Sequence, residues 1–308
     1  MKLFRLDRGL NGLSTLLLVL LSTGAAYGDS IFVTSLGTGT IGEYTTSGAV
    51  VNASLVGGVG NHYGLAVSGS DLFLTNFFSG TINEYATSGA MVNAALVMGL
   101  SGPYDIAVSG SDLFVTNIFS GTIGEYTTSG AVVNAALVTG LNNPTGIAVS
   151  GSDLFVTSLS GTIGEYTTSG AVVNASLITG VVSPYGIAVS GSDLFVTNNA
   201  NGTIGEYTTS GAVVNTSLVT GLSQPYRIAV SGSDLFVTNN ASGTIGEYTT
   251  SGATVNASLI TGLSGPMGIA IAASAPDATP EPSTIALLGI GLAAFAVWKK
   301  ARPGTPAA

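Results

Sequence analysis

The side chains best suited to recognition or catalysis recur at one place in an internal repeat, directly before its first predicted strand. Four of the six copies carry such residues there. The residues at this place are His62, Tyr63, Tyr104, Asp105, Tyr185, Tyr226 and Arg227. The faces of tyrosine rings stack on sugars or apolar ligands while the hydroxyl groups form hydrogen bonds, at low entropic cost. This set predicts ligand binding more strongly than catalysis.

A second variable loop of the repeat adds further aromatic side chains. Phe77, Phe78 and Phe119 lie between the second and third predicted strands, where other copies carry asparagine or leucine. Connectivity places both kinds of loop on the same rim of the fold, around the mouth of a central channel. We therefore expect a ligand-binding or glycan-binding rim. The alternative is neutral variation, because surface loops vary without functional cause.

Two charged residues of this set stand three repeats apart, which places them on opposite sides of the mouth. Asp105 and Arg227 can bridge the opening or hold a polar ligand between them. A solvent-exposed bridge would contribute at most about 1 kcal/mol to stability.

The case for catalysis depends on His62, which is the one histidine of the chain. A lone histidine is more often an ordinary loop residue than a general base. Asp105 is the one carboxylate expected near the channel, which is too few oxygen ligands for Ca²⁺. We therefore expect no metal site and no cofactor, and the sequence favours a binding protein over an enzyme.

A glutamate recurs in the third strand of every repeat. The six are Glu43, Glu84, Glu125, Glu165, Glu206 and Glu247. The blades would separate these side chains around the circumference, so they do not form one metal site. We expect each to form a structural hydrogen bond with a neighbouring blade.

The repeat itself determines the fold class. Its Ile-Gly-Glu-Tyr segment, once Ile-Asn-Glu-Tyr, starts at Ile41, Ile82, Ile123, Ile163, Ile204 and Ile245, with spacings of 41, 41, 40, 41 and 41 residues. Each unit contains four short β-type runs separated by glycine-bearing turns, which is typical of a propeller blade. The first two runs are almost wholly apolar, as expected of strands covered on both faces.

The phase of the repeat predicts a closed ring. The first run after the N-terminal segment, 30–34, corresponds to a second strand, and the last run, 268–271, corresponds to a first strand. Six complete units exist only if these two runs pair, whereas an open solenoid would leave exposed edges. We therefore expect an all-β, six-bladed propeller of four-stranded antiparallel blades over residues 29–272.

Composition narrows the classes of partner. Between residues 29 and 275 there are thirteen Asp and Glu and a single basic residue, Arg227. Such an acidic body repels a polyanion, so nucleic acid is not an expected partner. The chain contains no cysteine, so its stability depends on packing and hydrogen bonds instead of disulfides.

Both ends of the chain resemble targeting segments. Residues 1–28 combine a basic start, an apolar run and a small-residue site, which predicts a helical secretory signal peptide. At the other end, a linker at 273–282 contains Pro280-Glu281-Pro282, an apolar helix is expected at 283–298, and a basic cytoplasmic tail follows at 299–308.

This three-part C-terminus resembles the PEP-CTERM sorting signal of Gram-negative bacteria. The resemblance implies recognition of Pro280, Glu281 and Pro282 by an exosortase, removal of the transient membrane helix, and delivery to the cell surface or an exopolysaccharide matrix. The alternative is an ordinary single-pass anchor.

The repeats resemble the NHL and YVTN classes of propeller unit over residues 30–271, in stretches such as Gly-Ile-Ala-Val and Leu-Phe-Val-Thr. This likeness implies the fold without a function. We expect an exported binding or scaffold propeller whose partners are extracellular polysaccharide or surface proteins. The alternative is a hydrolase or lyase at the channel mouth, similar to gluconolactonase-type lactonases or to streptogramin lyases, the latter with a catalytic histidine.

Overall fold

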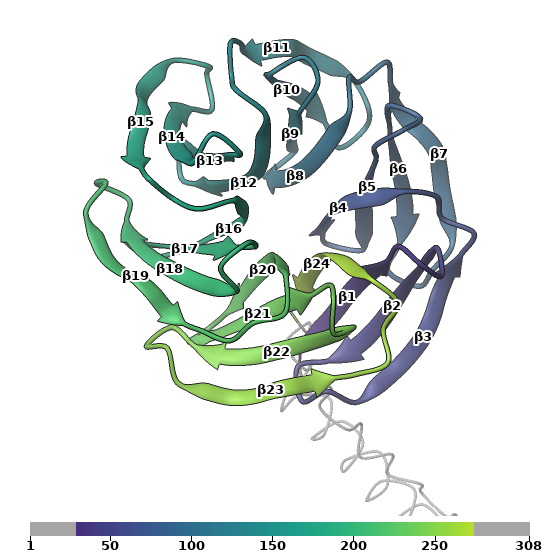
Figure 1. Ribbon diagram of the computed structural model, residues 1–308. Coiled ribbons are helices and arrows are strands. Elements are labelled where there is room, and N and C mark those ends of the chain that lie inside the picture. The colour runs from purple at the N-terminus through teal and green to yellow at the C-terminus, as the bar shows by residue number, and fades with distance from the viewer. Residues whose placement is uncertain (1–28, 274–308) are drawn as a thin grey trace, which may run out of the picture.

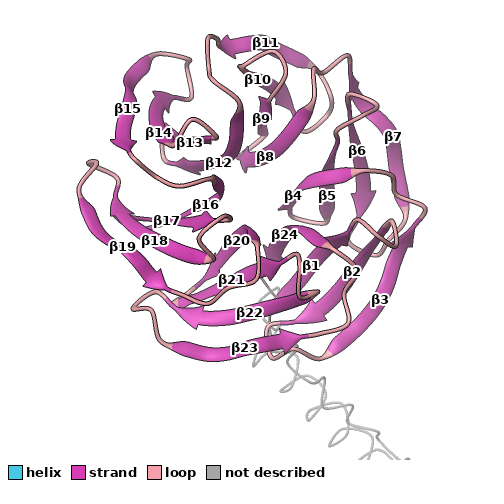
Figure 2. Ribbon diagram, viewed as in Figure 1, coloured by secondary structure: helices cyan, strands magenta, loops and turns pink. Residues whose placement is uncertain are grey.

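The computed structural model describes residues 29–273, and all regular structure in that range is β-strand (Figure 2). Six four-stranded antiparallel sheets surround a central axis as blades (Figure 1). The prediction of an all-β, six-bladed propeller is therefore confirmed. The expected signal peptide, PEP linker, sorting helix and basic tail lie outside the described residues. Residues 29–273 contain no helix with the length and hydropathy needed to cross a membrane.

Every blade has one innermost strand at the axis and three further strands that follow outward in order. Blade 1 contains β24 (Pro266–Ala272), β1 (Ser30–Ser35), β2 (Thr40–Thr45) and β3 (Val50–Gly57). Blade 2 contains β4 (His62–Ser68), β5 (Asp71–Asn76), β6 (Thr81–Ala86) and β7 (Met91–Met98). Blade 3 contains β8 (Pro103–Ser109), β9 (Asp112–Asn117), β10 (Thr122–Thr127) and β11 (Val132–Val138).

The other three blades follow the same order. Blade 4 contains β12 (Pro144–Ser150), β13 (Asp153–Ser158), β14 (Thr162–Thr167) and β15 (Val172–Thr179). Blade 5 contains β16 (Pro184–Ser190), β17 (Asp193–Asn198), β18 (Thr203–Thr208) and β19 (Val213–Val219). Blade 6 contains β20 (Pro225–Ser231), β21 (Asp234–Asn239), β22 (Thr244–Thr249) and β23 (Thr254–Ile260).

The ring closes inside blade 1, where the two ends of the described chain share one sheet. Strand β24 pairs antiparallel with β1, with Ser30 opposite Ala272 and Ile31 opposite Ile271. The last strand thereby supplies the innermost position of the first blade, as the phase of the repeat predicts. No blade of the ring is left with an incomplete sheet.

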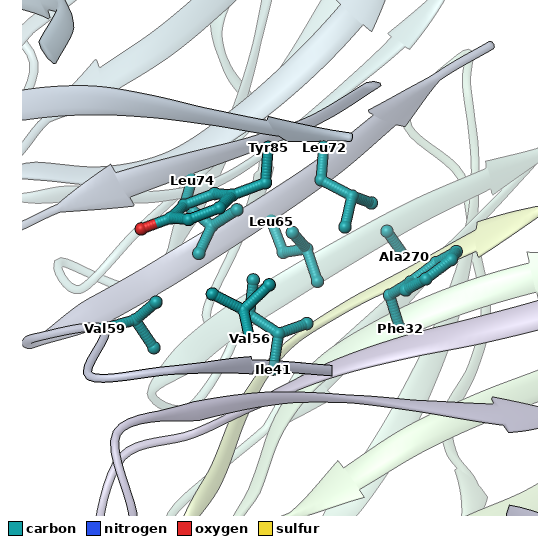
Figure 3. Packing of buried hydrophobic residues seen from close by; sticks show 9 residues of the cluster. All are labelled: Phe32, Ile41, Val56, Val59, Leu65, Leu72, Leu74, Tyr85 and Ala270. Atoms are coloured by element: carbon teal, nitrogen blue, oxygen red, sulfur yellow. The ribbon is translucent and has the colours of Figure 1, made fainter. Parts of the chain in front are cut away.

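Packing between adjacent blades forms the core. Figure 3 shows Phe32 and Ile41 of blade 1 facing Leu72, Leu74 and Tyr85 of blade 2. The phenylalanine of each second strand is at most 1% exposed. Strands β1 and β5 are covered on both faces, which explains why they are continuously apolar. Truncating one of these phenylalanines to alanine would cost about 3–5 kcal/mol.

Six buried threonines form a ring around the axis, and all of them except Thr34 donate a hydrogen bond to a carbonyl of the next blade. It consists of Thr34, Thr75, Thr116, Thr157, Thr197 and Thr238, each at most 1% exposed. In blade 5, the hydroxyl of Thr197 accepts a hydrogen bond from the amide of Gly186 and donates one to the carbonyl of Tyr226 in blade 6. This ring was not predicted from the sequence, although a threonine closes an apolar run in every repeat.

The two rims of the propeller differ in composition. One rim carries the turns between innermost and second strands, in which Gly110 and Gly151 have φ of +59°, together with the turns between third and outermost strands. We call it the glycine-turn face. The opposite rim carries the loops that vary between repeats, and it holds the candidate site residues selected from the sequence.

Candidate ligand-binding face

Seven aromatic side chains gather at the channel mouth on the variable rim, and we call them the aromatic face. They are Tyr63, Phe77, Phe78, Tyr104, Phe119, Tyr185 and Tyr226. Phe77 lies at the centre of one half, with its ring centroid 4.9 Å from Tyr63 and 5.0 Å from Phe119. On the other side, the rings of Tyr185 and Tyr226 are 4.7 Å apart. The structure thus brings together every aromatic residue that was selected from the sequence.

The tyrosines fill the mouth and do not leave it open. The hydroxyl groups of Tyr104 in blade 3 and Tyr226 in blade 6 form a hydrogen bond across the axis. Tyr63 packs beside Tyr104 with centroids 5.1 Å apart. Burial raises the pKa of Tyr104 and of Tyr226, so both remain protonated at neutral pH. The face is therefore a packed aromatic surface.

Asp105 and Arg227 meet beneath these rings. Nε of Arg227 lies 3.3 Å from Oδ1 of Asp105, an ion pair whose N–H is not aligned for a hydrogen bond. The guanidinium also donates through Nη1 to the carbonyl of Tyr185 and through Nη2 to that of Tyr104, both at 2.9 Å. It lies 5.1 Å from the ring centroid of Tyr104, within range of a cation–π contact.

This ion pair is buried, which corrects the expectation of a solvent-exposed bridge. The side chains of Arg227 and Asp105 are 5% and 10% exposed. Burial raises the pKa of Asp105, while Arg227 and the amide of Ile147, which donates to Oδ2 at 3.1 Å, act in the opposite direction. The pair is buried and contacts protein groups on several sides, so this geometry does not present it to an external ligand.

Both charged residues occupy positions that are glycine in the other four blades. The equivalents are Gly64, Gly146, Gly186 and Gly268. A Cβ on Gly64 would lie 2.8 Å from the Cα of Asp105 in the next blade. Side chains therefore cannot occupy this position in all six blades at once. The charged pair therefore fits because it stands at two opposite blades with small neighbours between them.

Phe78 and Phe119 are the aromatic side chains that project into solvent. They are 71% and 69% exposed. Phe119 also covers Gly102, where an added Cβ would lie 2.6 Å from the ring. Both rings pack against Phe77, at 5.1 and 5.0 Å between centroids. These exposed rings are available to a ligand without any rearrangement of the fold.

The same loop positions in blades 5 and 6 are occupied by Ala200 and Ala241. Asn199 and Asn240 precede them, and their amide groups donate to the carbonyls of Pro225 and Pro266 at 3.2 Å. These two blades build the same loop without aromatic residues. The fold therefore does not require phenylalanine at positions 78 and 119.

His62, the candidate for catalysis, is buried. It opens β4 at the position that proline occupies in the other five blades, and it is 2% exposed. Nδ1 lies 2.8 Å from the carbonyl of Gly60, while Nε2 has no hydrogen-bond partner among the described residues. Burial lowers the pKa of His62, so the ring is neutral at pH 7.

The repeated glutamates also differ from expectation. Glu43 accepts a hydrogen bond from Ser30 of its own blade, 3.0 Å away, and not from a neighbouring blade. In the other five blades an aspartate replaces this serine. Burial raises the pKa of Glu125, and repulsion from Asp112 raises it further. Glu125 and Asp112 line a groove of about 520 Å³ between two blades at the glycine-turn face, beside Phe114 and Thr168.

Comparison with known proteins assigns this propeller to a family. A model described as the Virginiamycin B lyase family matches residues 20–234, more than half of the chain. The chain belongs to the virginiamycin B lyase family. A second model, the PEP-CTERM protein-sorting motif, matches residues 278–301. The motif implies export and processing by an exosortase, which agrees with the interpretation of Pro280-Glu281-Pro282.

Solved structures agree with the fold of the virginiamycin B lyase family. Virginiamycin B lyase from Staphylococcus aureus is 21% identical with a TM-score of 0.57, covering 82% of this chain and 93% of that one. A catalytically inactive histidine-to-alanine form of that enzyme with quinupristin gives the same identity and TM-score, covering 76% of this chain and 85% of that one. A nidogen/laminin complex matches at 17% identity and a TM-score of 0.66, covering 81% of this chain and 100% of that one. No curated protein matches the chain.

Proposed function

We propose that this exported family member is a binding propeller of the cell surface or its polysaccharide matrix, and that its aromatic face binds a neutral glycan. The observation that supports this most directly is the pair of exposed rings, Phe78 and Phe119, which the fold does not require. Both rings pack against Phe77, so they form one continuous exposed apolar patch, and patches of this kind mark interaction sites.

The chemistry of the surface favours a sugar. The two phenylalanines offer flat apolar faces, and Tyr63, half-buried beside Phe77, adds a hydroxyl group close by. A pyranose ring presents apolar C–H groups and hydroxyl groups together, which suits this combination. Between residues 29 and 275, thirteen acidic residues and one arginine give a formal charge of −12. A neutral glycan avoids the repulsion that an acidic polymer would meet.

The alternative is a lyase of the kind for which the family is named. Family membership supports it, since the solved relatives include virginiamycin B lyases. Against it, His62 is only 2% exposed. Among the described residues, no three His, Cys, Asp or Glu side chains are grouped so that they could hold a metal ion. General-base catalysis needs a group within reach of substrate, and His62 does not have that access.

Glycan binding is tested with the Phe78→Ala/Phe119→Ala double variant. We expect the wild-type protein to bind a neutral hexose polymer, such as soluble β-glucan or dextran, or an oligosaccharide on a glycan array. The double variant should lose about tenfold or more in affinity, since each ring contributes about 1 kcal/mol of contact. Its melting temperature should be unchanged, because Ala200 and Ala241 occupy these positions in sister blades.

A matched control removes an exposed apolar side chain that lies away from the aromatic face. Val133→Ala does so on outer strand β11, where Val133 is 53% exposed, and should leave binding unchanged. An equal loss of glycan affinity in this control and in the phenylalanine variant would indicate non-specific adhesion. Binding that survives removal of both phenylalanines, or the absence of any glycan ligand alongside binding of a surface protein, would contradict the proposal.

The lyase alternative is tested with quinupristin, the compound in the related structure. We expect mass spectrometry to recover quinupristin unchanged. The variant His62→Pro, which gives blade 2 the residue of its five sister blades, should bind glycan like the wild type. Turnover of quinupristin that disappears in His62→Pro would establish the lyase and overturn the binding function.

A further inference from the structure

Blade 4 differs from the other five blades in the loop between its second and third strands, β13 and β14. Thr157 and Ile163 are six positions apart, whereas the equivalent residues of the other blades, such as Thr116 and Ile123, are seven apart. This missing residue accounts for the one spacing of 40 in the repeat. Ser158 also stands where blades 2, 3, 5 and 6 carry asparagine. Blade 4 therefore combines a shorter loop with a smaller side chain at the same place.

A pocket of about 220 Å³ lies beside this loop, on the side of blade 4 that faces blade 3. Its wall includes the buried side chain of Val156, and its edge includes the exposed Ser160. In blade 5, Asn198 occupies the position of Ser158 and donates a hydrogen bond to Thr203 at 3.0 Å. The shorter side chain of Ser158 does not extend in this way, so it leaves room for a ligand.

A chain of hydrogen-bonded hydroxyl groups lines the pocket. Ser158 donates to the carbonyl of Asn142, so the 2.9 Å bond between Ser158 and Ser160 must be donated by Ser160. The 3.3 Å bond between Ser160 and Thr162 is then donated by Thr162. Each hydroxyl group has one proton and two lone pairs. The chain therefore offers free acceptor sites to a ligand, and all three of its protons are already used.

Tyr166 supplies the complementary donor. It lines the same pocket and is 4% exposed, and its hydroxyl group has no hydrogen-bond partner among the described residues. Gly164 makes room for this group, because a Cβ there would lie 2.6 Å from the hydroxyl oxygen. Burial raises the pKa of Tyr166, so the hydroxyl group keeps its proton at neutral pH.

We propose that this pocket binds a neutral monosaccharide or a polyol of similar size. All of its lining residues are uncharged, so an ionic ligand would find no partner there. Its volume equals that of about seven water molecules, which is space for one sugar ring but less than the roughly 300 Å³ of pockets for drug-sized ligands. The hydroxyl groups of a sugar can donate to Ser160 and Thr162 and also accept from Tyr166. The site is distinct from the aromatic face, which contains no residue of blade 4.

The test measures binding of D-glucose, D-mannose, D-galactose and myo-inositol to the full chain by saturation-transfer NMR. We expect at least one of these probes to bind with a millimolar dissociation constant, as suits about a dozen non-hydrogen atoms. Ser158→Asn gives blade 4 the side chain of its sister blades and should weaken this binding about tenfold or more. Tyr166→Phe removes the free donor and should weaken binding about fivefold.

Tyr207→Phe is the matched control, because Tyr207 is the equivalent buried residue of blade 5. It should bind the probe like the wild type, and Tyr166→Phe keeps the proposal falsifiable if Ser158→Asn does not fold. Absence of binding for all four probes, or equal affinity in the wild type and Tyr166→Phe, would overturn the proposal.

The Phe78→Ala/Phe119→Ala variant separates this site from the proposed function. It should bind the monosaccharide like the wild type while it loses affinity for the glycan polymer. Loss of monosaccharide binding in this variant would assign the probe to the aromatic face and overturn the pocket. Polymer binding without any monosaccharide binding would also contradict the pocket and leave the proposed function intact.

Discussion

At the scale of single residues, some aromatic and charged side chains of the variable rim are packed into the fold, and others remain exposed. Arg227 and Asp105 replace glycines of the repeat and fill the mouth. Phe78 and Phe119 stand where sister blades carry alanine, and they remain exposed. The sequence predicts all four positions because repeats can be compared with one another. It does not predict the burial of the ion pair, because that depends on how closely six inner strands approach the axis.

The ion pair gives a prediction about coupled stability. Asp105→Gly alone should destabilise the propeller by about 3–5 kcal/mol, since it leaves the buried guanidinium of Arg227 unpaired. Arg227→Gly should have a similar effect. The double variant, which restores the glycine of the sister blades, should cost clearly less than the sum. Urea unfolding of all four proteins measures this coupling, and strictly additive losses would contradict it.

At the scale of elements, the strand and turn pattern is the best predicted part of the molecule. The expected runs 30–34 and 268–271 correspond to strands β1 and β24, with ends that agree to within two residues. Apolar runs and glycine turns are local signals, which explains this success. The threonine ring was not predicted, because the carbonyl groups that accept its hydrogen bonds lie in the next blade and no local sequence pattern identifies them.

The threonine ring gives a prediction about the connection between blades. Thr197→Val keeps the shape of the side chain but leaves the amide of Gly186 and the carbonyl of Tyr226 without this hydroxyl group. We expect a loss of about 2 kcal/mol in the free energy of unfolding. Thr197→Ser retains the hydroxyl group and should lose about 1 kcal/mol or less. Identical losses in both variants would assign the effect to packing.

At the scale of the whole molecule, closure of the ring determines what each face can do. Pairing of Ser30 with Ala272 brings the variable loops around one mouth and both chain ends to the opposite face. The phase of the repeat predicts this closure from the sequence. The filling of the mouth by tyrosine rings is not predictable in that way, because side-chain packing across the axis involves residues more than a hundred positions apart.

In five blades a glutamate and an aspartate lie close together, and these acidic pairs predict an unusual pH dependence of the stability of the propeller. Burial, and then repulsion from an aspartate of the same blade, raises the pKa of Glu84, Glu125, Glu165, Glu206 and Glu247. Glutamates with a raised pKa bind protons more tightly in the folded state. Stability should therefore increase as the pH falls from 7 toward the ordinary glutamate value of about 4.5.

Thermal unfolding between pH 7 and 4.5 measures this effect. His62, whose pKa is lowered by burial, opposes it below its ordinary value near 6.5, but as a single group against five. Asp112→Ser reproduces the arrangement of blade 1, where Ser30 donates to Glu43, and should reduce the slope. A melting temperature that falls steadily with acidification would show that the acidic pairs do not control stability.

Binding of a neutral glycan at the aromatic face is tested most directly by oxidative footprinting of the protein with and without β-glucan or dextran, whichever binds in the affinity assay. Phe78 and Phe119 are exposed and oxidisable, and Met91 on outer strand β7, 61% exposed, serves as the internal reference. We predict that glycan slows oxidation of both phenylalanines and leaves Met91 unaffected. Unchanged oxidation of Phe78 and Phe119 under saturating glycan, or protection of Met91 instead, would show that the glycan does not bind at this face.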